Sequence, residues 1–409
     1  MPRLALPRRL SYFIIVYGLT MLVATGTVPL GLYQAYADEF HFSPAVLTFL
    51  AASSMFGVIA AVVLCGNLSD RIGRRAVLLP AVLAGALSMV LFIFADGVAA
   101  LLAARISTGI AVGLFTGAGT AALTELVGPD GDTRRAATHA ATTSVAGFAI
   151  GPIIGGLFVQ YGPWPLQLVY IVSLALLVPL LVGVLLMPET VSQRTPFRIQ
   201  PQRLGAPPEG RRAFGLASVV ACCCFAGASF FQSLGPSVAV VLLGVSNKLV
   251  AAAVAVCFLG ASALAQIGLR GLPIRRATLT GLVLLPLGFV SVVGALLTDS
   301  LLLFVAGALA GGLGQGLAYL GGQSLVEKAT PPEKRGETFS LYMIVIYVSG
   351  GITAISFGLL AKRIGLDPAA LVYAGFVAAV SVAAMGISLR SGLLRVSAEA
   401  EANPIAQPV

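Results

Sequence analysis

The chain has 409 residues, of which 58% are hydrophobic and only 10% are charged, against about 25% charged residues in soluble proteins. With a mean hydropathy of +0.97, this composition excludes an ordinary soluble domain and indicates a membrane protein. The formal charge of +9 would suggest nucleic acid for a soluble chain. Here the basic residues form short clusters between apolar segments, so we expect no nucleic-acid partner and assign the charge to membrane topology.

Twelve segments reach the roughly 20 apolar residues that a spanning helix needs. They are 11–36, 44–65, 76–95, 99–126, 137–160, 165–187, 213–243, 248–269, 277–297, 300–326, 337–361 and 368–389. The longest connection is 188–212, which carries five arginines. We therefore expect an all-α membrane protein with twelve transmembrane helices in two pseudo-symmetric six-helix bundles. Its expected parts are an N-terminal bundle (1–187), a cytoplasmic linker (188–212), a C-terminal bundle (213–391) and a cytoplasmic tail (392–409).

The distribution of basic residues supports this topology. With the N-terminus in the cytoplasm, 21 of the 25 basic residues fall in cytoplasmic segments and three in outer segments. Since one missed span would invert every later loop, both termini are predicted to be cytoplasmic. Arg3, Arg8 and Arg9 before an apolar run also resemble a signal peptide, but the run is too long and eleven more follow. The arginine-rich composition and short loops favour a bacterial inner membrane.

The two halves share a glycine pattern. A shift of 203 residues superposes Gly109, Gly113, Gly147 and Gly155 on Gly312, Gly316, Gly350 and Gly358. Because each half has an even number of spans, the halves are parallel, as in transporters whose substrate site lies between two bundles near the midplane.

The short charged turn 66–75 lies between two uncharged apolar segments. Glycine permits tight packing where helices leave the membrane, and Asp70 can accept hydrogen bonds from a helix N-terminus. The pattern Gly-x-x-x-Asp-Arg-x-Gly-Arg-Arg resembles the loop between helices two and three of the major facilitator superfamily of transporters. The resemblance implies a latch on the inner gate, in which Arg74 pairs with Glu125 at the end of helix four. Its implied members are Gly66, Asp70, Arg71, Gly73, Arg74 and Glu125. The alternative, which we favour for Arg75, is that the charges only set topology.

Arg105 is the one charge well inside a span, where a charge is costly and by default functional. The spacing Arg105-x-x-x-Gly109-x-x-x-Gly113 resembles the helix-four motif of the superfamily. In that motif the arginine faces the bundle interior and, in proton-coupled members, is linked to proton transfer. The alternative is an arginine that snorkels to the outer face.

The segment 147–156 combines glycines with a helix-bending proline. Pro152 has no N–H to donate, so the helix is predicted to bend there, and a glycine stripe lets a neighbouring backbone pack closely. The pattern resembles the helix-five motif of drug/proton antiporters in the superfamily. Its members here are Gly147, Gly151, Pro152, Gly155 and Gly156. The alternative is a generic interface of small residues.

Polar and aromatic side chains on apolar helices are the candidates for a substrate cavity, with helix–helix packing as the alternative for each. They are Thr27, Gln34, Phe231, Gln232, Gln315, Tyr319 and Gln323. This mostly neutral set suits an apolar or weakly polar organic substrate. No acid lies plainly at the midplane, so Asp38, at the outer end of helix one, is the leading candidate for the proton carrier. Its position leaves proton coupling itself open.

The sequence predicts a secondary active transporter that exports small apolar or amphipathic organic compounds by alternating access. The proton gradient is the expected energy source, without a cofactor. The run Cys222–Cys224 is not expected to form a metal site, because consecutive helical residues splay by about 100° and the three thiols do not converge on one ion. No enzyme is expected, because the spans lack converging acids, a metal set or a nucleophile with its base. The expected surroundings are the lipid bilayer of the cell membrane, and the resemblance implies a monomer. Alternatives are a permease for a sugar or other metabolite with different or no proton coupling, and a transporter-like sensor that does not transport.

Overall fold

The computed structural model describes residues 6–66, 68–127, 133–191 and 204–394. The chain divides into two compact units, one of Met1–Phe42 with Leu50–Gln202 and one of Ser43–Phe49 with Arg203–Val409. All regular structure in the described ranges is helical, as expected of segments that must satisfy their backbone hydrogen bonds within a bilayer. Twelve of the helices are long and apolar enough to cross a membrane. The chain is therefore a multi-pass, all-α membrane protein, as the sequence predicts.

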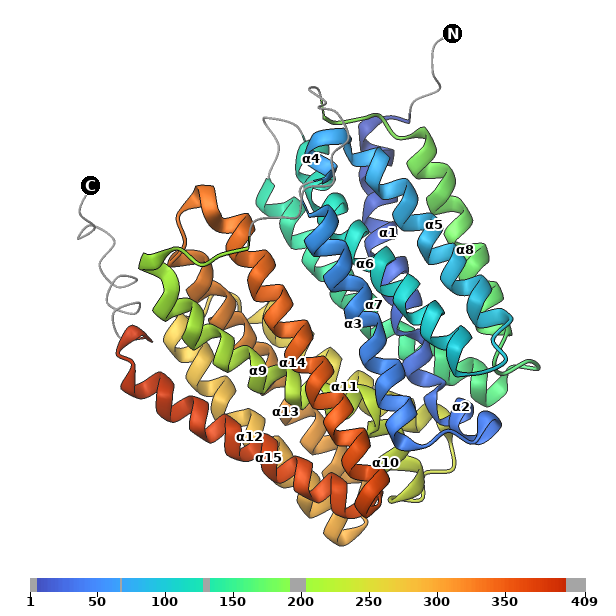
Figure 1. The fold of residues 1–409 in the computed structure, drawn as a ribbon, viewed down its shortest axis with the longest axis vertical. Coiled ribbons are helices and arrows are strands. Elements are labelled where there is room, and N and C mark those ends of the chain that lie inside the picture. Colours follow the sequence, from blue (N-terminus) through green and yellow to red (C-terminus); the bar gives the residue numbers. More distant parts are fainter. Residues whose placement is uncertain (1–5, 67, 128–132, 192–203, 395–409) are drawn as a thin grey trace. The chain divides into compact units, whose positions relative to one another are not determined.

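The first half of the chain supplies the helices of the first unit. These are α1 (Arg8–Thr27), the 3-10 turn η1 (Val28–Gly31), α2 (Tyr33–Phe40), α3 (Pro44–Cys65), α4 (Leu68–Ile72), α5 (Arg74–Ile93), α6 (Val98–Leu126), α7 (Thr133–Tyr161) and α8 (Leu168–Leu186). Helix α1 lies against α6, α7 and α8, and α5 lies against α6 and α8 (Figure 1). Helix α1 is thus the central element of this unit, and residues 50–65 of α3 belong to the same unit.

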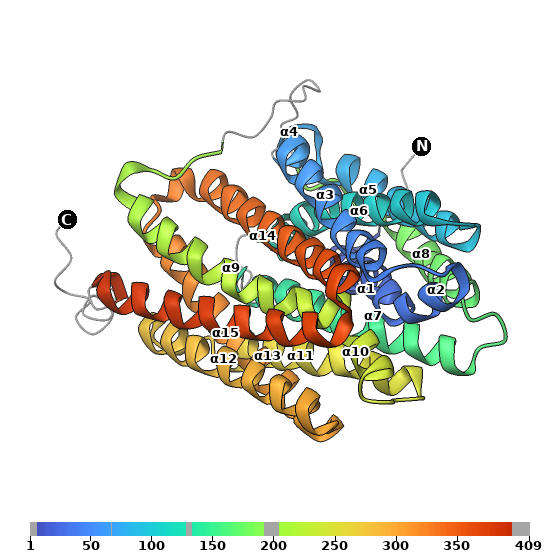
Figure 2. The same ribbon diagram turned by 60° about the horizontal axis from the view of Figure 1, so that its bottom comes forward.

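The second half repeats this plan. Its elements are η2 (Pro208–Gly210), α9 (Arg211–Ser233), α10 (Gly235–Val241), α11 (Lys248–Gly268), α12 (Ile274–Thr298), α13 (Leu301–Lys328), η3 (Pro332–Lys334), α14 (Arg335–Ile364) and α15 (Leu366–Arg390). Helix α9 contacts α13, α14 and α15, and α12 lies between α13 and α15. Figure 2 shows α9 and α15 running side by side. Helix α9 is therefore the counterpart of α1.

The first helix of each half is broken, whereas the sequence predicted continuous helices at 11–36 and 213–243. Helix α1 ends at Thr27 and is followed by η1 and α2, while α9 ends at Ser233 and α10 begins at Gly235. In both places a proline, Pro29 or Pro236, stands at the start of the following element. Proline has no N–H to donate to the preceding turn, so the α-helical hydrogen bonding stops there.

Aromatic side chains fill the core of the second unit. Phe230 and Phe231 are fully buried, and Phe231 stacks on Phe258 with 4.6 Å between ring centroids. Phe289 and Phe304 complete the cluster around them. This packing explains why α9 is apolar over most of its surface.

Candidate functional site

We refer to Asp70, Arg74 and Glu125 as the latch, and the structure brings these three side chains together. Arg74 is the first residue of α5, and its Nη2 lies 2.6 Å from Oε1 of Glu125 near the end of α6. Its Nη1 lies 2.5 Å from Oδ1 of Asp70 and donates to Ser69 Oγ at 2.7 Å. The Arg74 side chain is 8% exposed and that of Glu125 is 32% exposed. Two acids therefore neutralise one mostly buried guanidinium.

The sequence did not identify a further part of this cluster, which comes from the segment after α8. Glu189 Oε1 accepts a hydrogen bond of 2.8 Å from the backbone N–H of Arg74, so it caps the start of α5. A carboxylate is favourable there because the first N–H groups of a helix are unpaired and carry partial positive charge. Thr190 donates its hydroxyl to Glu125. The sequence signal for this part of the cluster is the run Pro188-Glu189-Thr190. The residues that Glu189 and Thr190 bind, Arg74 and Glu125, lie more than 60 residues away in the chain.

Gly73 makes that approach of Glu189 sterically feasible. Its φ of +109° is a conformation that side-chain-bearing residues rarely adopt, and a Cβ there would collide with the Glu189 carboxylate. Gly73 is expected from the sequence to permit tight packing, and the group that packs against it is the Glu189 carboxylate. Gly66 follows α3 directly and donates its N–H to Val62, and Arg71 is the penultimate residue of α4.

Arg105 lies in α6 and is 4% exposed, so it does not snorkel to the surface. Its guanidinium donates to backbone carbonyls of α1 and α3, at 2.6 Å to Gly26, 3.2 Å to Leu50 and 3.3 Å to Ala51. A fourth bond, of 2.8 Å, goes to Ser54 Oγ. Among the described residues no carboxylate pairs with it. A buried cation held by neutral acceptors keeps its positive charge available to any anion or dipole that approaches.

The glycines that follow Arg105 bring α6 against α3. A Cβ on Gly109 would collide with the carbonyl of Ser54, and a Cβ on Gly113 would lie 2.8 Å from that of Ala61. From the other side, a Cβ on Gly57 would lie 3.0 Å from the Cα of Gly109. The two backbones therefore touch at this crossing, which brings Ser54 within reach of Arg105.

The helix-five stripe packs against α1 and η1. A Cβ on Gly147 would lie 2.6 Å from the carbonyl of Thr20, and one on Gly151 would lie 2.9 Å from the nitrogen of Val28. Gly155 approaches the carbonyl of Val28 in the same way. In return, a Cβ on Gly31 would lie 2.6 Å from the Pro152 carbonyl and 2.7 Å from the Gly156 nitrogen. The stripe is thus a close contact between two backbones.

Two of the expected cavity residues in the first unit are occupied with local bonds. Thr27 is buried and donates to the carbonyls of Val23, Ala24 and Gly147 at 3.1 to 3.2 Å. Gln34 Nε2 donates to Asp38 Oδ1 at 3.0 Å within α2. Thr27 therefore joins α1 to α7, which is the packing alternative, and Asp38 shares its carboxylate with a neighbouring amide.

In the second unit, Phe231 and Gln315 were expected to line a cavity, but both side chains are buried against other side chains. Phe231 is 0% exposed in the aromatic cluster, because its ring is apolar and four other rings surround it. Gln315 is buried and accepts the hydroxyl of Ser262 from α11. Gln232 is half-buried, and Tyr319 packs on Phe225 with ring centroids 5.8 Å apart.

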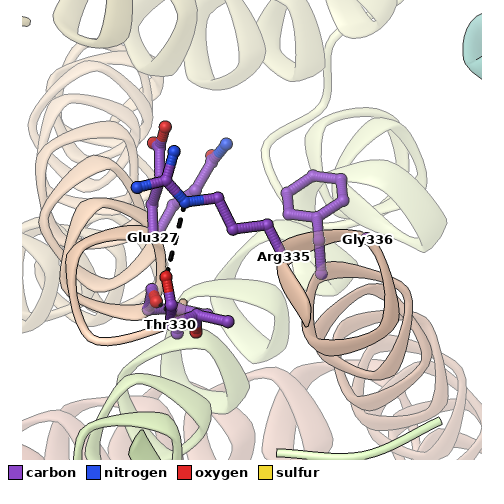
Figure 3. A pocket seen from close by; sticks show the side chains of 7 residues that line it. Glu327, Thr330, Arg335 and Gly336 are labelled. Atoms are coloured by element: carbon purple, nitrogen blue, oxygen red, sulfur yellow. Dashed lines mark hydrogen bonds between the residues drawn. The ribbon is translucent and has the colours of Figure 1, made fainter. Parts of the chain in front are cut away.

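Gln323 does line a cavity. It lies at the end of α13, and the cavity of about 340 Å³ extends to the start of α14 (Figure 3). The other lining residues include Val326, Glu327, Thr330, Arg335 and Phe339. Both charged side chains come from helix ends, so this cavity combines a carboxylate, a guanidinium and an apolar wall.

Comparison with known proteins identifies the family. The family model of the Major Facilitator Superfamily matches residues 13–290. The Multidrug efflux pump LfrA of Mycolicibacterium smegmatis is 33% identical over 153 residues, which is 36% of this chain and 30% of that protein. The Gentisate transporter of Corynebacterium glutamicum is 26% identical over 179 residues, 42% of this chain and 38% of that protein. The Arabinose-proton symporter of Bacillus subtilis is 30% identical over 115 residues, 28% of this chain and 24% of that protein.

Solved structures agree on the fold. A crystal structure of the peptide transporter POT matches with a TM-score of 0.73 at 15% identity, covering 95% of this chain and 96% of that chain. A bacterial homologue of the human lysosomal transporter Spinster, in an inward-facing and unoccupied conformation, matches with a TM-score of 0.68 at 18% identity, covering 98% and 99%. Since the curated relatives are each aligned over less than two fifths of their own length, they do not establish a substrate. The family model covers more than half of the chain, and the chain therefore belongs to the major facilitator superfamily of membrane transporters.

Proposed function

We propose that this protein is a secondary active transporter that exports small apolar or amphipathic organic compounds in exchange for protons. The observation that carries the proposal is the segment 147–156, whose sequence resembles the helix-five motif of drug/proton antiporters. Its glycines contact α1 and η1 closely: the atoms nearest to Gly31 are all backbone atoms of 152–156, and Gly151 faces the backbone of Ala24 and Val28 beside the Thr27 hydroxyl. A tilt of α1 must therefore move α7 with it, as alternating access by rocking of a bundle requires. The similarity to a multidrug efflux pump supports the same substrate class.

Arg105 supports an ion-coupled mechanism. Its buried charge is held by three carbonyls and one hydroxyl, so it is not cancelled by a carboxylate among the described residues. A fixed, buried positive charge raises the free energy of a bound proton or cationic substrate nearby and so favours its release. Asp38, bonded to Gln34 in α2, remains our candidate for the proton carrier.

The latch supports a two-state gate. Each of its ion pairs joins groups from different segments, and the Arg74–Glu125 pair links α5 to α6. Rearrangement of α5 against α6 has to break or stretch that pair, so the latch adds a barrier between two conformations. We further propose that the protein works as a monomer in the cell membrane with both termini in the cytoplasm. The proton gradient supplies the energy, and no cofactor takes part.

A metabolite permease is the second candidate function. It is favoured by the similarity to a gentisate transporter and to an arabinose-proton symporter. The mostly neutral polar residues Gln232 and Gln323 are compatible with a hydroxylated substrate as well as with a drug.

The proposal is tested with purified protein in proteoliposomes that contain a pH-sensitive dye. Lipophilic cations, neutral drugs, an aromatic acid and a pentose are added in turn. We expect proton movement in response to the first two groups, and loss of that response in Asp70→Asn and Arg105→Ala protein that inserts normally. A response to the acid or the pentose alone would support the permease instead. Normal drug-induced proton movement by Asp70→Asn would contradict the role of the latch.

A further inference from the structure

The cavity between α13 and α14 is lined by two opposite charges that form no direct ion pair with each other among the described residues. Glu327 and Arg335 both line it, yet no atoms of the two side chains form an ion pair within 4.0 Å. The Glu327 carboxylate has no hydrogen-bond partner among the described residues. Arg335 donates only from Nε, at 3.4 Å to the carbonyl of Thr330 (Figure 3). The terminal nitrogens of Arg335 make no bond to a described residue.

At the matching helix end in the first unit, the glutamate is paired with an arginine. Glu125 is the penultimate residue of α6, and Glu327 is the penultimate residue of α13, the matching helix of the second half. Arg74 covers Glu125 with three hydrogen bonds of 2.6 to 3.2 Å. In the second unit Glu327 and Arg335 form no such ion pair among the described residues, and both line a cavity of about 340 Å³. An internal ion pair in one unit thus corresponds to a cavity lined by two unpaired charges in the other.

The shape and chemistry of the wall define what fits there. Arg335 disfavours a simple cation and Glu327 disfavours a simple anion, whereas a molecule that carries both charges meets a partner for each. Val326 and Phe339 add an apolar surface, and Phe339 is 43% exposed. Gln323 adds an amide that can donate or accept a hydrogen bond. Thr330 is buried, and its backbone carbonyl accepts the hydrogen bond from Nε of Arg335 at the cavity wall.

We propose that this cavity is a binding site for a zwitterion with an apolar portion. Its ammonium group binds Glu327, its carboxylate or phosphate binds the terminal nitrogens of Arg335, and its apolar part lies on Val326 and Phe339. The site lies where the spans Leu301–Lys328 and Arg335–Ile364 end and begin. Both a membrane lipid with an ethanolamine headgroup and a dissolved amino acid can reach that depth. A bound zwitterion joins the end of α13 to the start of α14, as Arg74 joins α5 to α6.

Binding of defined probes tests the proposal with the full-length protein in detergent. The lipid probe is lysophosphatidylethanolamine, with lysophosphatidylglycerol as the anionic comparison, and retention is measured by native mass spectrometry. The soluble probe is L-phenylalanine, titrated by calorimetry. Saturable binding of the first probe identifies a lipid, and of the second a dissolved zwitterion. We expect Glu327→Gln and Arg335→Gln each to weaken binding about tenfold, which corresponds to the roughly 1.4 kcal/mol of one charge-assisted hydrogen bond.

Matched variants keep the result interpretable. Glu333→Gln removes an exposed acid from the same connection without touching the cavity lining, and it should bind as the wild type does. The exchange Glu327→Arg with Arg335→Glu should recover part of the binding, because the ligand can turn round. The proposal is overturned if neither probe binds saturably, or if both Gln variants bind as the wild type does. The assay measures binding alone, so its outcome does not depend on whether the protein exports drugs in exchange for protons.

Discussion

The ends of α6 and α13 occupy matching places in the two halves, but the glutamates near these ends differ in whether a basic side chain pairs with them. At the end of α6, Glu125 is held by Arg74, and Arg74 is held in turn by Asp70 and Ser69. At the end of α13, Glu327 faces a cavity and has no partner among the described residues. The helices that precede them also begin differently: α5 begins with Arg74 after Gly73, whereas α12 begins with Ile274 after Pro273.

The glycines that repeat between the two halves have the same packing role in both, whereas the charged residues differ. Gly109 and Gly312 are both in backbone contact with a neighbouring helix, α3 and α11 respectively. In contrast, the position that matches Arg105 is Ala308, which is fully buried. Close helix packing is therefore common to both units, while among the described residues the buried charge and the latch occur in the first unit.

The largest expected effect comes from removing the carboxylate of Glu125 near the end of α6. Glu125→Gln leaves the mostly buried Arg74 with Asp70 as its one remaining acid, so we expect a loss of about 3 kcal/mol in the free energy of unfolding. Glu327→Gln, at the end of the matching helix α13, should change that quantity by less than about 0.5 kcal/mol because the carboxylate is exposed and has no partner among the described residues. Denaturant unfolding of both variants in detergent measures the difference. Equal losses would remove the contrast between the two helix ends.

A methyl group added to the helix-five stripe should have the next largest effect. Gly151→Ala places a Cβ within 2.9 Å of the Val28 nitrogen, and overpacking of this kind costs about 2 kcal/mol. Gly117→Ala is the control in the same unit, since its Cβ would have no neighbour within 4 Å. Thermal unfolding should separate the two variants. An unchanged midpoint in Gly151→Ala would show that α1 and α7 separate without cost.

The cap on α5 gives a smaller effect. Glu189→Gln keeps a side-chain oxygen but removes the charge next to the helix N-terminus, and we expect a loss of about 1 kcal/mol. The matching helix α12 begins after Pro273, whose side chain cannot accept a capping hydrogen bond. Hydrogen exchange at the first turn of α5 is the measurement. Unchanged protection of the Arg74 amide would argue against the cap.

The smallest expected loss of stability concerns a hydrogen bond between two helices that occurs in both units. Thr27 donates to the carbonyl of Gly147 at 3.2 Å, and Ser229 donates to the carbonyl of Gly350 at 2.9 Å. Thr27→Val and Ser229→Ala should each cost about 0.6 kcal/mol, the average for hydrogen bonds between membrane helices. Chemical unfolding of both variants tests this. A loss in only one of them would show that the two joints differ in strength.

Much of the candidate site could be predicted from the sequence because its signals are local. The pairing of Arg74 with Glu125 was implied by the resemblance of the charged turn 66–75 to the loop of the superfamily. The inward-facing position of Arg105 was implied by the resemblance to the helix-four motif. Phe231 shows the limit of such signals, because an aromatic residue on an apolar helix has the same pattern in a core as beside a cavity. Only its neighbours Phe258 and Phe289 distinguish the two.

The sequence by itself determined the number of spanning helices, the fold class and the family, since length, hydropathy and short motifs are properties of contiguous residues. The tertiary structure decided which atoms those motifs meet. It placed Glu189 at the start of α5, directed Arg105 to the carbonyls of α1 and α3, and left Glu327 beside a cavity. These contacts join residues far apart in the chain, and their geometry depends on how closely glycine-lined helices approach. Helix packing therefore had to be known before they could be found.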